Sequence, residues 1–144
     1  MKKRILWMED DYYAIRGLMR PLELEGFKID VATSVSECYI KGQAWTVYDM
    51  IIVDLILPLS NDENIPVEIT KWIDENMEYP GIGMVKWFIE EKKVDCPLLI
   101  LSVVNDVFER FQLPKNKSIK ILSKKGILPS KIKQEVLNII GLNE

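Results

Sequence analysis

Histidine is absent from the sequence, and cysteine occurs only at Cys38 and Cys96. Without histidine the usual zinc-binding spacings cannot form, and neither Ser-His-Asp nor Cys-His catalysis is available. Two cysteines do not make a disulfide framework. Long apolar runs are also missing: the run after the basic N-terminus, residues 5–8, ends at Glu9, too early for a signal or a membrane-spanning segment. We therefore expect a reduced, soluble, cytoplasmic protein without membrane association.

Charge is unevenly distributed along a chain whose net charge is only −3. Residues 60–80 contain six acidic side chains against one lysine, whereas residues 115–133 contain seven lysines and no acid. Each run is most simply a solvated surface, and neither predicts direct binding to DNA. The length of 144 residues suits one domain that can bury its own core. We therefore expect a single domain over residues 1–144.

Five short apolar segments alternate with helical patterns. The predicted strands are residues 3–8, 27–32, 48–56, 97–104 and 118–123, and the predicted helices are residues 12–25, 34–44, 80–93, 105–112 and 129–140. Within the first helix, Pro21 predicts a kink or an early end because proline removes a backbone hydrogen bond. The alternation of strands and helices indicates an α/β fold with a parallel sheet that is covered on both faces.

Residues 57–79 are too many for an ordinary connection between a strand and a helix. We interpret the acidic part, at about residues 60–80, as an insertion that contains a short helix after Pro66. Its Trp72 is the tryptophan that we would test as a partner contact. The following sequence GIGMVK, residues 81–86, lacks the third glycine of a dinucleotide-binding loop and follows no strand, so we interpret it as a helix start.

Polar side chains lie near the carboxyl ends of four predicted strands. They are Glu9 and Asp10 on the first, Asp54 on the third, Ser102 on the fourth and Lys124 on the fifth. In a doubly wound sheet these ends meet at one crevice. Three carboxylates there call for a hard cation such as Mg²⁺, and an ammonium with a hydroxyl would complete a site for a phosphoryl group. A carboxylate that acts as nucleophile would form an acyl phosphate.

Each of these residues also has a simpler explanation when it is taken alone. Acids at positions 9–11 can cap the next helix, a role that best suits Asp11, and Asp54 can cap a turn. Ser102 can be a small residue at a strand end, and Lys124 can belong to the solvated basic region. One shared site explains the order and spacing of the whole set better than four coincidences do.

The ordered motifs ILWMEDD, VDLILP, LILS and ILSK resemble those of the receiver domain of two-component response regulators, which are CheY-like proteins, over essentially the whole chain. The resemblance implies a doubly wound, flavodoxin-like sheet of five parallel strands in the order 2-1-3-4-5. It also implies that Asp54 is the phospho-acceptor and that Mg²⁺ is the cofactor. The implied ligands are Glu9, Asp10, Asp54 and the backbone carbonyl of Ile56. Ser102 would be the switch hydroxyl and Lys124 the phosphate-binding lysine.

Four features depart from the family pattern. The interval from Asp54 to Ser102 is longer than usual, which assigns the acidic segment as an insertion. Lys125 stands where the family usually has a proline in a cis linkage, and such a linkage is costly before any other residue. Ile121 occupies a switch position that often holds an aromatic ring. Val103 follows Ser102, where a small residue commonly leaves room for the phosphate.

The resemblance implies a stand-alone response regulator with no output domain. Its phosphoryl donor would be a sensor histidine kinase or a histidine phosphotransfer protein, and it would signal by partner binding or onward phosphotransfer. The sequence leaves a homodimer and the cognate kinase open. One alternative is a pseudo-receiver, an interaction module that does not cycle through phosphorylation. Another is a phosphohydrolase, which is opposed by Ile56 because such enzymes commonly carry a second acid there.

Overall fold

Five parallel strands form one sheet in the computed structural model, which describes residues 3–59, 65–115 and 118–141. The strands are β1 (Arg4–Met8), β2 (Lys28–Ala32), β3 (Met50–Asp54), β4 (Leu98–Ser102) and β5 (Ile119–Ser123). Their order in the sheet is β2-β1-β3-β4-β5, and every neighbouring pair is parallel. The predicted α/β fold and strand order are therefore confirmed. Residues 60–64 of the predicted insertion lie outside the described residues.

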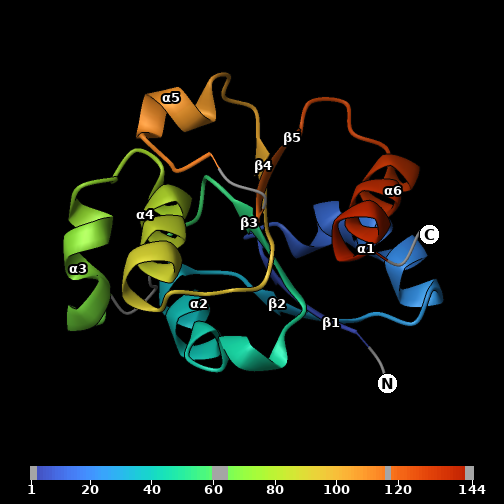
Figure 1. The fold of residues 1–144 in the computed structure, drawn as a ribbon, viewed down its shortest axis with the longest axis horizontal. Coiled ribbons are helices and arrows are strands. Elements are labelled where there is room, and N and C mark those ends of the chain that lie inside the picture. The colour runs from blue at the N-terminus through green and yellow to red at the C-terminus, as the bar shows by residue number, and fades with distance from the viewer. Residues whose placement is uncertain (1–2, 60–64, 116–117, 142–144) are drawn as a thin grey trace.

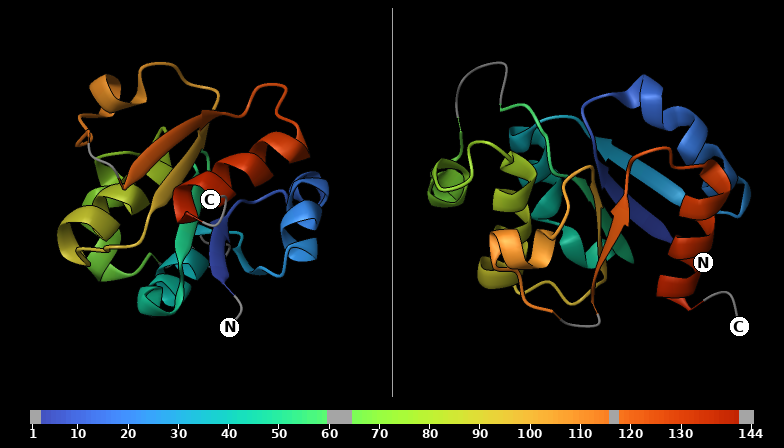
Figure 2. Two further views of the ribbon diagram at one scale, coloured as in Figure 1. Left: turned by 45° about the vertical axis from the view of Figure 1, so that its right-hand side comes forward. Right: turned by 90° about the horizontal axis from the view of Figure 1, so that it is seen from above.

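Helices cover both faces of the sheet (Figures 1 and 2). One face carries α1 (Tyr12–Leu24) and α6 (Pro129–Ile140), and the other carries α2 (Val35–Gly42), α4 (Pro80–Lys86) with the π-helical turn η2 (Trp87–Glu91), and α5 (Val107–Phe111). A 3₁₀ turn, η1 (Trp45–Val47), precedes β3. In the described part of the chain no helix has the length and apolar character needed to cross a membrane.

The alternation of side chains along the central strands builds two cores. Leu6 of β1 and Ile51 of β3 face the core under α2 and α4, whereas Trp7 and Ile52 face the core under α1 and α6. Every residue of β3 and of β4 is buried, as expected for parallel strands that are covered on both sides. The continuous apolar runs seen in the sequence follow from this burial.

Helix α1 continues through Pro21 and ends at Leu24. Of the two predicted outcomes, a kink or an early end, the early end does not occur. The missing N–H of Pro21 costs the helix one hydrogen bond. Packing of the buried Met19 and Leu22 on either side of Pro21 against the sheet compensates for that bond.

The inserted segment forms a helix, α3 (Val67–Asp74), that packs on the outside of α4 (Figure 1). Its apolar side chains Ile69, Trp72 and Ile73 are buried in the core that α4 and α2 share. Trp72 is only 6% exposed, which contradicts its interpretation as a partner contact. The described part of this segment, residues 65–80, is thus packed against the rest of the structure through α3.

Two glycines at the start of α4 allow this close packing. The Gly81 N–H donates to the carbonyl oxygen of Leu55 at 2.8 Å, and a Cβ on Gly81 would lie 2.2 Å from the carbonyl oxygen of Asp54. A Cβ on Gly83 would lie 2.7 Å from the carbonyl oxygen of Trp72 in α3. The sequence GIGMVK is therefore the helix start that we predicted. Its two glycines let the backbone of α4 lie close to the backbone after β3 on one side and to that of α3 on the other.

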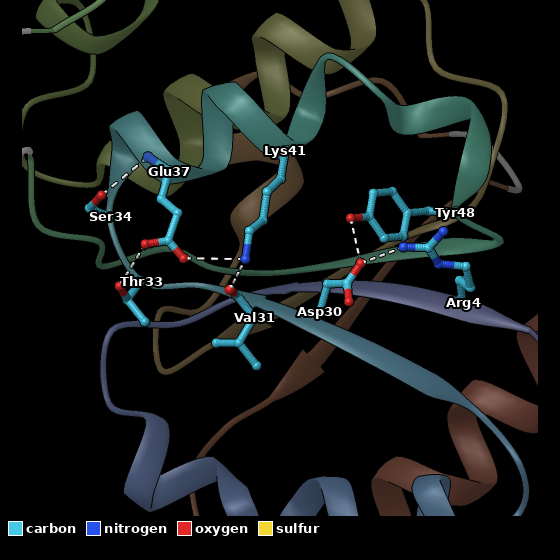
Figure 3. Close-up of polar contacts among 8 residues, drawn as sticks. All are labelled: Arg4, Asp30, Val31, Thr33, Ser34, Glu37, Lys41 and Tyr48. Atoms are coloured by element: carbon cyan, nitrogen blue, oxygen red, sulfur yellow. Dashed lines mark hydrogen bonds and ion pairs between the residues drawn. The ribbon is translucent and has the colours of Figure 1, made fainter.

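Polar contacts join β2 to Arg4 of β1, to Lys41 of α2 and to Tyr48 (Figure 3). After the strand, Ser34 caps α2 by accepting from the Glu37 N–H at 3.2 Å, and Lys41 donates to the carbonyl of Val31 at 2.7 Å. Within the strand, the Asp30 carboxylate accepts hydrogen bonds from the Tyr48 hydroxyl and from the Arg4 guanidinium, each at 2.8 Å. Burial alone would raise the pKa of Asp30, but these two hydrogen bonds outweigh burial and lower that pKa below its ordinary 3.8.

Replacing Tyr48 with phenylalanine is expected to lower the free energy of unfolding by about 1 kcal/mol at pH 7, because the Asp30 carboxylate loses a hydrogen bond. A lowered pKa in the folded state stabilises the protein above the unfolded-state pKa, and this contribution is lost as pH falls through the folded-state pKa. The difference between the variant and the wild type should therefore shrink below about pH 4. Urea unfolding at pH 7 and at pH 3 measures it, with the exposed Tyr13→Phe as the control that should change little.

Candidate functional site

Four of the predicted site residues meet at the carboxyl edge of the sheet. Glu9 follows β1, Asp54 ends β3, Ser102 ends β4 and Lys124 follows β5. The residues Glu9, Asp54 and Ser102 are almost wholly buried, at 1%, 5% and 4% exposure. All four line one cavity of about 300 Å³. The parallel sheet brings them together because neighbouring strands end at the same edge.

The Lys124 ammonium joins the two buried carboxylates. Its Nζ lies 2.5 Å from Glu9 Oε1 and also contacts Asp54 Oδ2. Burial and the hydrogen bond with Asp54 raise the pKa of Glu9 to about 8, although Lys124 acts in the opposite direction. Burial would lower the pKa of Lys124, but its hydrogen bonds to Asp54 and Glu9 outweigh burial and raise that pKa. The site therefore disfavours a second negative charge, and Lys124 supplies a positive charge that contacts both carboxyl groups.

The second carboxylate oxygen of Asp54 is bound by the loop that follows β3. Asp54 Oδ1 accepts a hydrogen bond from the Ile56 N–H at 2.9 Å. This is the turn-capping role that an isolated aspartate would have, and here it fixes the rotamer of a side chain that also faces the cavity. The two interpretations of Asp54 are thus compatible. Oδ1 holds the Asp54 carboxylate in one orientation, and Oδ2 contacts the Lys124 ammonium.

Ser102 points its hydroxyl at the loop after β4. Its Oγ accepts from the Val104 N–H at 2.8 Å and donates to the Val104 carbonyl at 3.0 Å. Val103 and Val104 line the cavity beside it, and Val103 is 62% exposed. The larger residue after the serine is therefore mostly exposed to solvent, although it lines the cavity.

The other predicted site residues have different positions. Asp10 and Ile56 are exposed residues that line the same cavity. Asp11 caps α1 by accepting from the Ala14 N–H at 3.0 Å, as we predicted. Ile121, within β5, is half buried and packs against the core under α2 and α4.

The oxygen donors that line the cavity suit a magnesium ion, but within the described residues they are not grouped closely enough to hold one. Glu9, Asp10, Asp54 and Ile56 all line the cavity, and carboxylate and carbonyl oxygens are the donors that a hard cation prefers. Among residues 3–59, 65–115 and 118–141, however, no three Asp, Glu, Cys or His side chains form a group that would hold a metal ion. Lys124 occupies the place between Glu9 and Asp54.

Tyr79 is an aromatic residue of the cavity that the sequence analysis did not name as part of the site. It directly precedes α4 and lines the cavity together with Asp54 and Ser102. No local pattern marks it, because its position depends on how the insertion returns to the sheet. Gly81 and Gly83 were the only sequence feature that could have indicated the position of Tyr79. Glycines there are consistent with a backbone that approaches the strand ends closely.

Neither a protein-family model nor a curated protein matches this chain. Solved structures do match it. The receiver domain of the Francisella response regulator 1452 superposes with a TM-score of 0.70 at 17% identity, covering 99% of this chain and 100% of that one. A two-component response regulator from Clostridium difficile gives 0.67 at 21% identity, covering 99% and 100%. The chemotaxis response regulator CheY4 of Vibrio cholerae gives 0.68 at 15% identity, covering 96% and 99%. The chain therefore has the fold of a response regulator receiver domain.

Proposed function

We propose that this protein is a phosphorylatable receiver in which Asp54 accepts a phosphoryl group from a phosphohistidine. The observation that carries the proposal is the pairing of a buried, oriented aspartate with an ammonium in a cavity at the carboxyl edge of the sheet. An ionised carboxylate is the nucleophile that such a transfer needs. The ammonium is placed where a transferred phosphoryl group would bring negative charge.

In the transfer step, a carboxylate oxygen of Asp54 attacks the phosphorus, a P–O bond forms, and the P–N bond to the donor imidazole breaks. The imidazole then takes a proton from solvent. The Ile56 N–H keeps Asp54 in one orientation during the attack. Lys124 balances the charge of the phosphoryl oxygens, and Ser102 exchanges its hydrogen bonds with Val104 for one to the phosphoryl group.

Magnesium would be held by Glu9, Asp10, Asp54 and the carbonyl of Ile56, and when bound it would neutralise charge on the carboxylates and on the phosphoryl group. The donor would be a sensor histidine kinase or a histidine phosphotransfer protein. The phosphorylated form would signal by binding a protein partner or by passing the phosphoryl group on. Direct binding to DNA is not part of the proposal.

The competing function is that of a pseudo-receiver, an interaction module without a phosphorylation cycle. One observation favours it: Lys124 already contacts both Glu9 and Asp54, and the carboxylates do not form a metal-binding group within the described residues. Val103, Ile121 and Lys125 depart from the family pattern in the same direction. The intact set of Asp54, Glu9, Asp10 and Lys124 opposes it.

Incubation with acetyl phosphate and Mg²⁺, followed by intact-mass measurement, distinguishes the two functions. We expect the wild type to gain one phosphoryl group and Asp54→Asn to gain none. Asp74→Asn, which changes an exposed aspartate on α3, should be modified like the wild type. An unmodified wild type, under conditions in which a receiver of known activity is modified, would establish the pseudo-receiver instead.

A further inference from the structure

Tyr79 lines three cavities, and it has no role in the proposed phosphoryl transfer. It lines the cavity of about 300 Å³ that holds Asp54. It also lines two further cavities beside α5, one of about 330 Å³ with Phe111 and one of about 750 Å³ with Val104. A single side chain thus borders both the acceptor site and the surroundings of a helix.

Tyr79 also holds α5 directly. Its ring meets the ring of Phe111 edge to face, with centroids 5.4 Å apart and an interplanar angle of 73°. The Arg110 guanidinium lies 5.3 Å from the centroid of the Tyr79 ring and 3.7 Å from the carboxylate of Glu78. Figure 1 shows α5 beside the turn that joins α3 to α4. Glu78 and Tyr79, two adjacent residues at the end of the insertion, therefore contact α5 through an ion pair and through ring contacts.

Helix α5 is weakly fixed by its own structure. It has five residues, of which only Val107 is buried, and cavities lie beside it. The residues at its two ends, Asp106 and Gln112, have φ values of 57° and 55°, in the left-handed region that favours glycine. A short helix between two such residues has little internal stability, so its position depends on contacts with its neighbours.

We propose that Tyr79 is a positioning residue that couples the acceptor cavity to α5. The inference rests on the proposed function, because the signal is a phosphoryl group on Asp54. That group fills part of the cavity that Tyr79 lines, and it draws Ser102 away from Val104, which borders both this cavity and the one beside α5. The Tyr79 ring shifts, its contact with Phe111 is lost, and α5 is released.

Hydrogen exchange of the peptide that spans residues 105–113 tests the coupling, with intact mass recorded on the same samples. Without phosphorylation, Tyr79→Leu is expected to speed exchange in α5 by about two- to tenfold, the factor that the loss of one aromatic pair implies. Phe111→Leu removes the other ring and should act alike. Tyr79→Phe keeps the ring and should match the wild type, as should Tyr13→Leu at an exposed site.

Phosphorylation with acetyl phosphate and Mg²⁺ should then speed α5 exchange in the wild type, Tyr79→Phe and Tyr13→Leu, and should add nothing in Tyr79→Leu. An adduct without a change in α5, or an equal response in Tyr79→Leu, would overturn the coupling alone. If no adduct forms, the proposed function fails, and the coupling fails with it.

Discussion

Gly81→Ala is expected to lower the free energy of unfolding by about 3 kcal/mol, at the upper end of the cost of overpacking a core. The added Cβ would lie 2.2 Å from the carbonyl oxygen of Asp54 and 2.7 Å from the Cα of Leu55. Both neighbours are backbone atoms, so no side-chain rotation relieves the clash. Because α4 must move away from β3, phosphorylation of Asp54 should also be impaired. Urea unfolding and intact mass after acetyl phosphate treatment measure the two effects.

Gly17→Ala is the matched control. Gly17 lies within α1, and a Cβ there would meet no atom within 4 Å. Since alanine is a better helix former than glycine, this variant should be stabilised by about 0.5–1 kcal/mol. Equal effects of the two substitutions would show that the close approach of α4 to Asp54 does not exist in solution.

Lys124→Met is expected to destabilise the protein by about 2 kcal/mol in magnesium-free buffer, somewhat less than the loss of one partner from a fully buried ion pair. The reason is that Glu9 and Asp54 remain buried beside each other without a cation. Adding Mg²⁺ should restore part of the loss, and a second substitution, Glu9→Gln, should restore part of it without the metal. Urea unfolding of the single and double variants forms the thermodynamic cycle.

The neighbouring Lys125→Met provides the control for charge. Lys125 is exposed, so its loss should change the free energy of unfolding by less than about 0.5 kcal/mol. If the two lysine variants unfold alike, the ion pairs of Lys124 contribute nothing to stability. The proposed role of this lysine as the cation of the site would then lose its support.

Much of this arrangement could be predicted from residues alone. The run from Met50 to Val53 indicates a buried strand, and an acid at the end of such a strand must lie at the carboxyl edge of the sheet. The same rule predicts the positions of Glu9, Ser102 and Lys124, because strand ends are set by local apolar patterns. These patterns are short-range, so one sequence is enough to detect them.

The contacts that depend on tertiary packing could not be predicted. The burial of Trp72 and the position of Tyr79 follow from how α3 packs on α4, and two glycines allow that packing without specifying it. The bridge that Lys124 makes to Glu9 and Asp54 depends on a side-chain conformation that strand ends leave open. Similarly, Pro21 lies inside α1 because sheet packing outweighs a local helix preference.

Borohydride trapping tests the central claim most directly. An aspartyl phosphate is reduced by sodium borohydride to homoserine, which tandem mass spectrometry locates in the sequence. After treatment of the wild type with acetyl phosphate and Mg²⁺, we expect homoserine at position 54. Its presence at another acid, or its absence from a protein whose mass has increased by one phosphoryl group, would contradict the assignment of Asp54 as the phospho-acceptor.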